Sequence, residues 1–136
     1  MSDMTKAVFD VLNGDGPLTA LLGTTEGAPS IFTSDVPGNA VFPYLVSIGE
    51  INQLPFDDKT QEGREVDRDI ECYADADGDA RTVEDIAEKV RALFHRKMMT
   101  IANFTNVITR VRGPHVNDGD GYYGRVVTVT FMLDKL

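Results

Sequence analysis

The sequence predicts an α+β fold, in which an antiparallel or mixed sheet of about four to five strands carries one main helix and a short N-terminal helix on one face. Two segments repeat apolar residues at helical spacing, and four others favour strands. Their order along the chain is helix, two strands, helix, two strands. With 136 residues, the chain is long enough for one domain with a real core, so we expect residues 1–136 to form a single domain.

The first third of the chain predicts short elements. Residues 3–12 are expected to form a helix, because Met4, Val8 and Leu12 fall on one face. Turn-forming residues at 13–17 end it. A brief turn of helix at 18–22 and a short strand at 31–33 are expected to follow.

The remaining elements are longer. A strand at 44–51, opened by Pro43, and a strand at 65–74 are expected to form a hairpin around a polar loop at 55–63. The main helix is predicted over 83–94, where apolar residues make one stripe. Strands at 104–112 and 122–133 follow, joined by a loop at 113–121.

Composition excludes several classes of function. The net charge is −9, from 22 acidic and 13 basic residues, so phosphate backbones and anionic lipid should be repelled. No apolar run approaches the ~20 residues that a membrane span needs. The beginning of the sequence lacks the basic and apolar stretches of a signal peptide. The single cysteine cannot form an intrachain disulfide, which fits a reducing compartment.

The stretch Asp75–Asp79 resembles the start of a calcium loop, because Asp75, Asp77 and Asp79 match its first three ligand positions. The glycine and the closing glutamate that such a loop requires are replaced by Ala80 and Ile86. We therefore predict no metal site and no cofactor here.

A structural role explains this stretch better. Asp79 or Thr82 can cap the main helix, and Thr82–Asp85 resembles a capping box with Asp in place of Glu. The stretch is then an acidic, capped entry to the helix, on an outer or end surface of the molecule.

The sequence offers no convincing catalytic site. None of the familiar catalytic or phosphate-binding motifs occurs, and His95 and His115 belong to different segments. Cys72 alternates with Ile70 and Ala74 on an apolar strand face, which is typical of a core residue rather than a nucleophile. We therefore predict that the protein is not an enzyme.

The most informative segment is the strand 65–74. Side chains of a strand alternate between its two faces, which places four acids in a row on one face: Glu65, Asp67, Asp69 and Glu71. The other face takes apolar residues, with Arg68 as an intruder. The acidic face has two interpretations: it is a solvated face of an antiparallel sheet, or it is a surface that must repel something anionic.

The series of segments along the chain resembles the tail completion, or tail terminator, proteins of long-tailed bacteriophages and phage-like particles. The resemblance covers most of the chain in the right order. It is carried by residues 18–23, 42–46, 70–74 and 87–93 (LTALLG, FPYLV, IECYA and AEKVRAL) and by the β-rich end of the chain. Two features depart from the usual pattern: Arg68 stands where an apolar residue would be expected, and ADADGDAR lengthens the strand-to-helix joint.

This resemblance implies a structural virion protein of the tail or neck, assembled in the host cytoplasm. Members are small α+β subunits that form a ring, usually a hexamer. The ring caps the head-proximal end of the tail tube and joins it to the head–tail connector. Its partners are therefore further copies of itself, the major tail tube protein and the connector or stopper protein, with no membrane involved.

In this family sheets line the channel and helices lie outside. DNA passes through the lumen without specific binding, so a lumen that repels phosphate is physically sensible. Glu65, Asp67, Asp69 and Glu71 are the expected channel-lining residues. Within the same class, the alternative is another neck or connector component, or a tail-tube subunit. A small calcium-binding or ligand-binding module is an alternative from a different class, and an enzyme is a third.

Overall fold

The fold is α+β, as the sequence predicts. A computed structural model describes residues 2–57, 62–101 and 104–135. The helices are α1 (Ser2–Asn13), α2 (Gly16–Thr19) and α3 (Ala80–Phe94). The long strands are β4 (Tyr44–Asp57), β5 (Glu62–Asp75), β7 (Phe104–Val116) and β8 (Tyr122–Lys135). The short strands are β1 (Thr24–Thr25), β2 (Ala28–Pro29), β3 (Ile31–Phe32) and β6 (Thr100–Ile101).

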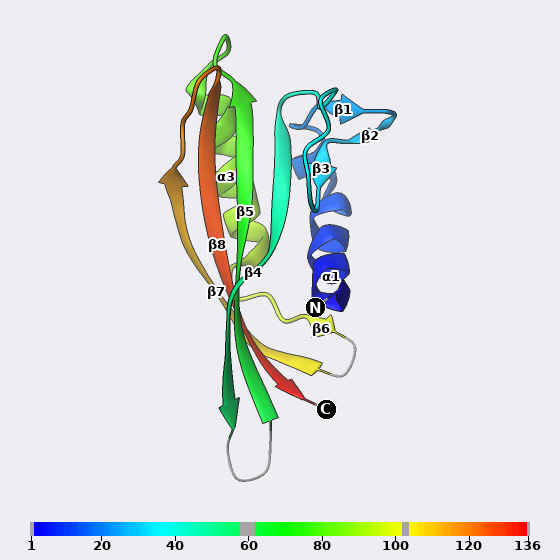
Figure 1. Cartoon of the computed structure of the whole chain (residues 1–136), viewed down its shortest axis with the longest axis vertical. Coiled ribbons are helices and arrows are strands. Elements are labelled where there is room, and N and C mark those ends of the chain that lie inside the picture. Colours follow the sequence, from blue (N-terminus) through cyan, green and yellow to red (C-terminus); the bar gives the residue numbers. More distant parts are fainter. Residues whose placement is uncertain (1, 58–61, 102–103, 136) are drawn as a thin grey trace.

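The main sheet has the strand order β3-β4-β5-β8-β7-β6. The four long strands pair antiparallel to their neighbours, whereas β3 pairs parallel to the beginning of β4. Figure 1 shows α3 lying across one face of the sheet and α1 lying beside β3 and β4. The lower parts of the long strands extend beyond the helices. None of the helices in the described part of the chain is long and apolar enough to cross a membrane.

The core lies between the helices and one face of the sheet. The apolar stripe of α3 is fully buried and packs on alternate residues of β5 and β8. Phe94 and Phe131 make an edge-to-face ring contact at 6.1 Å across this layer. On α1, the predicted stripe of Met4, Val8 and Leu12 is fully buried. Helical and strand periodicities therefore converge on one apolar cluster.

Arg68 lies in this core, as its position in the sequence predicts. It is fully buried, on the same side of β5 as Val66 and Ile70. Its Nη2 atom donates a hydrogen bond to Thr5 Oγ1 of α1 at 3.1 Å. The charged side chain therefore connects the N-terminal helix to the middle of the sheet.

The strands are longer than the sequence predicts, and two helix boundaries differ. β4 continues through Asp57 and β5 begins at Glu62, so most of the predicted loop 55–63 is strand; its residues 58–61 lie outside the described part. β7 likewise continues to Val116, into the predicted loop 113–121. Backbone pairing tolerates polar side chains on these extensions, which hydrophobic alternation cannot detect. α3 begins at Ala80 rather than residue 83, and α2 spans Gly16–Thr19 rather than 18–22.

Candidate functional site

Glu65, Asp67, Asp69 and Glu71, here called the acidic row, lie along β5 on the face of the sheet opposite α3. All four are half-buried, whereas their neighbours Val66, Arg68, Ile70 and Cys72 are fully buried on the helix side. The alternation predicted from the sequence is therefore confirmed. In Figure 1, α3 lies behind β5 and β8, so the face of these strands opposite α3 is directed to the viewer.

Hydrogen bonds hold three carboxylates of the acidic row in place. Thr130 Oγ1 of β8 donates to Asp67 at 2.5 Å, and Thr128 Oγ1 donates to Asp69 at 2.6 Å. Each threonine is the direct cross-strand partner of its aspartate. The Tyr73 hydroxyl donates to Glu71 at 2.7 Å. These side chains are therefore ordered parts of the sheet surface, rather than freely solvated charges.

Two arginines of β7, Arg110 and Arg112, stand on the same face and are here called the arginine pair. The register places Arg110 beside Thr130 and Arg112 beside Thr128. The guanidinium Nη2 of Arg112 lies 3.7 Å from Asp67 Oδ2, and 63% of its side chain is exposed. The face therefore carries a basic stripe beside the acidic one, which the sequence analysis missed. Period-two alternation in β7 could have indicated it, but only with the strand register known.

Five aromatic side chains form a row at one end of this face. Phe32, Phe42, Tyr44, Tyr73 and Tyr122 are all half-buried. The ring of Tyr44 contacts those of Phe32, Phe42 and Tyr73 at centroid distances of 5.8, 5.0 and 5.4 Å, and the ring of Tyr73 contacts that of Tyr122 at 5.1 Å. Burial, together with the hydrogen bond to Glu71, raises the pKa of the Tyr73 hydroxyl, which stays protonated at neutral pH. This aromatic row continues the acidic row across β3, β4, β5 and β8, and it too was missed.

The loop between β5 and α3 has the capping geometry that the sequence predicts. Asp79 caps α3 by accepting a bond from the Arg81 amide at 2.9 Å, and it also pairs with the Arg81 guanidinium at 2.6 Å. Those bonds lower the pKa of its carboxyl. Asp75 accepts a bond from the Asp77 amide at 3.0 Å. Thr82 lies inside the helix, so Asp79 is the cap and the alternative cap at Thr82 is wrong.

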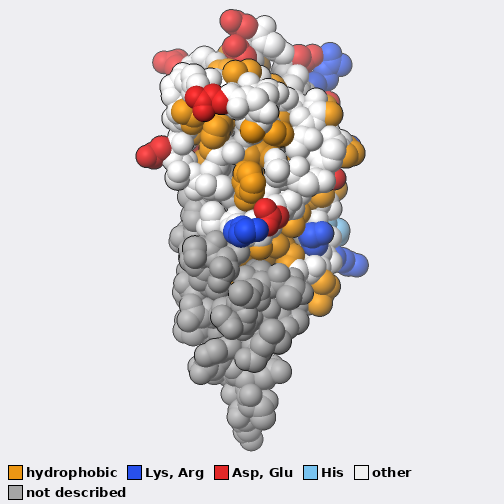
Figure 2. Space-filling model, turned by 90° about the vertical axis from the view of Figure 1, so that its right-hand side faces the viewer, with side chains coloured by type: hydrophobic (Ala, Val, Ile, Leu, Met, Phe, Trp, Pro, Cys, Tyr) orange, Lys and Arg blue, Asp and Glu red, His pale blue; other side chains and the backbone are white. Residues whose placement is uncertain are grey.

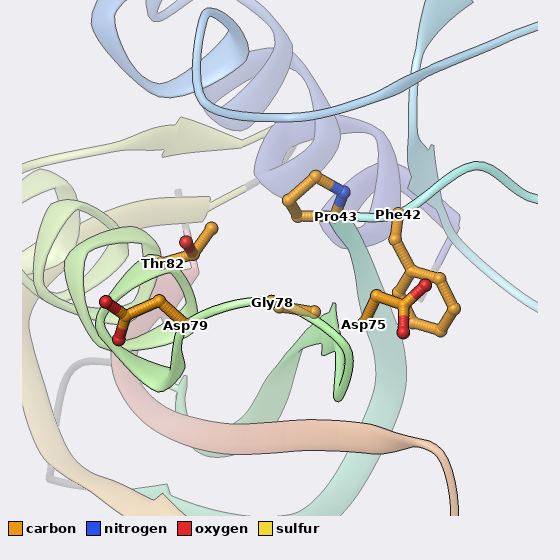
Figure 3. A pocket seen from close by; sticks show the side chains of 7 residues that line it. Phe42, Pro43, Asp75, Gly78, Asp79 and Thr82 are labelled. Atoms are coloured by element: carbon orange, nitrogen blue, oxygen red, sulfur yellow. The ribbon is translucent and has the colours of Figure 1, made fainter.

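A pocket of about 250 Å³ lies beside this loop (Figure 3). Asp75 and Asp79 lie on its opposite sides, separated by Gly78, so their carboxylates do not converge on a common point. Within residues 2–57, 62–101 and 104–135, no group of three or more histidine, cysteine or acidic side chains could hold a metal ion. The absence of a calcium site stays a prediction that titration must test.

Cys72 is a core residue, as predicted. It is fully buried, and burial raises the pKa of its thiol to about 12. The two histidines belong to different elements, because His95 follows α3 and His115 lies near the end of β7.

The family model for tail completion protein gp17 matches residues 6–134. The chain belongs to this family. It is therefore a structural protein of the phage tail, and its place is in the virion. As part of such a particle it assembles with other virion proteins.

Solved structures show the same fold. A chain of the virion of a native gene transfer agent particle superposes with a TM-score of 0.76 and 22% identity, covering 97% of this chain and 93% of the other. A second solved chain gives a TM-score of 0.55 and 16% identity, covering 100% of this chain and 96% of the other. No curated protein matches the sequence.

Proposed function

We propose that the protein is a tail terminator subunit. Six copies form a ring that caps the head-proximal end of the tail tube, ends its growth and joins it to the head–tail connector at the neck. Its direct partners are further copies of itself, the major tail tube protein and the connector or stopper protein. One domain, residues 1–136, carries this role without catalytic activity or a cofactor.

The observation that carries the proposal is the uneven covering of the sheet. α3 and the buried apolar cluster occupy one face, whereas the acidic row, the arginine pair and the aromatic row occupy the other. In a ring whose helices lie outside, this second face is directed to the axis. Glu65, Asp67, Asp69 and Glu71 then line the channel.

Electrostatics supports the passage of DNA along such a lining. Among the described side chains of this face, the four carboxylates of the acidic row outnumber the two guanidinium groups of the arginine pair, so this part of the face keeps an excess of negative charge. Repeated around a ring, this excess repels phosphate. The hydrogen bonds from Thr128, Thr130 and Tyr73 keep three of the carboxylates directed as they are. DNA therefore meets a surface that offers it no stable binding site.

The terminator role is tested on growing tubes. Purified protein, added to polymerising tail tube protein, is expected to stop elongation and to appear as a ring at one end of each tube in negative-stain images. Light scattering should report a hexamer, either for the protein alone or after tube addition. Tubes that bind the protein yet continue to grow contradict the terminator role and favour a connector component.

The channel lining is tested by charge reversal. Asp69→Lys with Glu71→Lys should create salt-sensitive binding of duplex DNA in assembled rings, because binding then releases counterions. The matched control is Asp85→Lys with Glu88→Lys, which makes the same charge change on the exposed side of α3. Equal DNA binding by both double variants, in rings that are otherwise intact, contradicts the assignment of the acidic row to the channel.

A further inference from the structure

Within the described residues, a short strand covers only a small part of each edge of the main sheet. β3 pairs with β4 only at Leu45 and Val46, and β6 pairs with β7 only at Phe104 and Thr105. In the part of the chain that the structure describes, no other strand pairs with the outer edges of β4 from Ser47 to Asp57 and of β7 from Asn106 to Val116. A long edge with unpaired amide and carbonyl groups is a template for another strand.

The two open stretches are matched. The bounds 47–57 and 106–116 give each of them 11 residues. Each contains one proline, Pro55 or Pro114, which cannot donate to a new ladder and so restricts where pairing can occur. The part left without a proline runs from Ser47 to Leu54 in β4 and from Asn106 to Gly113 in β7.

Other elements of the same chain cover only one part of the β4 edge. β3 and α1 lie beside the upper part of β4, and the outside of this region carries gathered apolar side chains (Figure 2). Among the four long strands, β4 and β7 are the outermost, on opposite sides of the sheet. The open edges are therefore directed to opposite sides, as a ring contact between neighbours requires.

Strand direction selects how two copies can meet. Because β4, β5, β8 and β7 alternate in direction, the two edge strands are antiparallel to each other. A rotation about an axis along the strands preserves those directions, so β7 of one copy arrives antiparallel to β4 of the next. The contact is heterologous and closes into a ring when the rotation permits.

We propose that, in the ring of the proposed function, β7 of each copy pairs antiparallel with β4 of the next, so that the sheets join into one continuous barrel. The pairing depends on the proposed function, because it presupposes a ring of this chain. The surface that closes the ring is then the pair of open strand edges, and the partner is a second copy of the same chain.

The internal register indicates which residues meet. One row across the sheet reads Asn52, Asp67, Thr130 and Arg110, and the next reads Leu54, Glu65, Met132 and Ile108. When copies sit side by side, Arg110 of one lies near Asn52 of its neighbour, apart from the stagger that closing a barrel imposes. Acidic and basic stripes then alternate around the ring, and each acidic row has an arginine pair two strands away on both sides.

Hydrogen exchange tests the pairing in the full-length protein. About half of the amides in residues 47–54 and 106–112 point to the outer edge, because the others bond to β5 or β8. These outward amides should exchange about tenfold or more slowly in the ring than in the dilute monomer, whereas the inward ones should change little. Amides of α3, already bonded within the helix, serve as the internal control.

Disulfide trapping distinguishes pairing of β4 with β7 from a ring contact that only shields these strands from solvent. In a Cys72→Ala background, Asn52→Cys with Arg110→Cys, and Leu54→Cys with Ile108→Cys, should give a ladder of covalent oligomers under mild oxidation. Variants moved by two residues along β4 allow for the stagger, because a disulfide requires Cα atoms within about 7 Å. Asp85→Cys with Arg110→Cys is the matched control and should give no ladder.

The outcomes are distinguishable. A ring whose edge amides exchange as fast as in the monomer, or one that gives no ladder with any edge pair, overturns the strand pairing and leaves the terminator role standing. Absence of any oligomer, both alone and on the tail tube, overturns both proposals.

Discussion

The reactivity of Cys72 tests the register of β5, on which the position of the acidic row depends. A slip of one residue would exchange the two faces of the strand, so it would expose the thiol and turn the carboxylates toward α3. In the structure the thiol is fully buried beside Ile70 and Ala74, with its pKa raised to about 12. The native protein should therefore resist a bulky disulfide reagent.

The magnitude follows from ionisation, because the thiolate is the reacting species. At pH ~8, a free thiol with a pKa of ~8.5 is roughly one-quarter thiolate. A thiol with a pKa of about 12 is ionised to about one part in 10⁴ at that pH. Ionisation thus slows reaction of the buried thiol by about three orders of magnitude. Reaction through local opening, where burial no longer raises the pKa, is limited instead by the free energy of opening.

The assay compares the release of the coloured leaving group in native buffer and in denaturant, with Cys72→Ala as the blank. Because the chain has one cysteine, no other thiol contributes. Native and denatured rates within about tenfold of each other would refute both the burial and the register.

The same pKa shift has a consequence for stability. Because the folded pKa is raised, the unfolded chain loses the proton first, and the contribution of Cys72 is complete only below the unfolded pKa of ~8.5. It is lost as the pH rises toward about 12. Denaturant unfolding of wild type and Cys72→Ala between pH ~8 and ~11 should show a steeper loss for the wild type. Parallel curves would contradict the shift.

Two further predictions concern polar contacts. Thr130→Val and Thr128→Val should each lower the free energy of unfolding by about 1–2 kcal/mol in urea titrations, because each removes a hydrogen bond to a carboxylate. Thr33→Val, at an exposed site, is the control. Unchanged urea midpoints for both Thr130→Val and Thr128→Val would contradict a stabilising role of these hydrogen bonds. Asp79→Ala should cost about 1 kcal/mol through loss of the helix cap. Asp77→Ala should cost much less, so equal losses would show that the cap is misassigned.

Local periodicity predicted much of the fold. The stripes of α1 and α3 and the alternation in β5 follow from spacings within one segment, and Met4, Val8, Leu12 and Cys72 are buried accordingly. The ends of β4, β5 and β7 were predicted poorly, because ladder pairing continues through polar residues such as Asp57 and His115. The residues that share a sheet face with Asp67 were equally inaccessible, because cross-strand neighbours are distant in sequence.

The cross-strand residues beside the acidic row, which the sequence did not predict, change the interpretation of its charges. Four bare carboxylates on adjacent sites would repel one another and destabilise the sheet. Instead, Thr130 and Thr128 donate to Asp67 and Asp69, and Arg112 lies 3.7 Å from Asp67. This compensation allows the negative charge to be kept on a sheet surface without a large cost in stability.

A channel surface that carries both the acidic row and the arginine pair suits passage of a polyanion better than a lining with charges of only one sign. A wholly basic lining would bind phosphates and hold the DNA, whereas unpaired carboxylates would oppose assembly of the ring itself. With each arginine pair flanked by acidic rows, a phosphate attracted to Arg110 is also repelled by the carboxylates of its own and the neighbouring copy.

Removing Asp67 and Asp69 should therefore strengthen DNA binding through the arginines, even without any added positive charge. Asp67→Asn with Asp69→Asn, which keep acceptors for the threonines, should give rings that retain DNA in a salt-dependent manner, and adding Arg110→Ala with Arg112→Ala should abolish this retention.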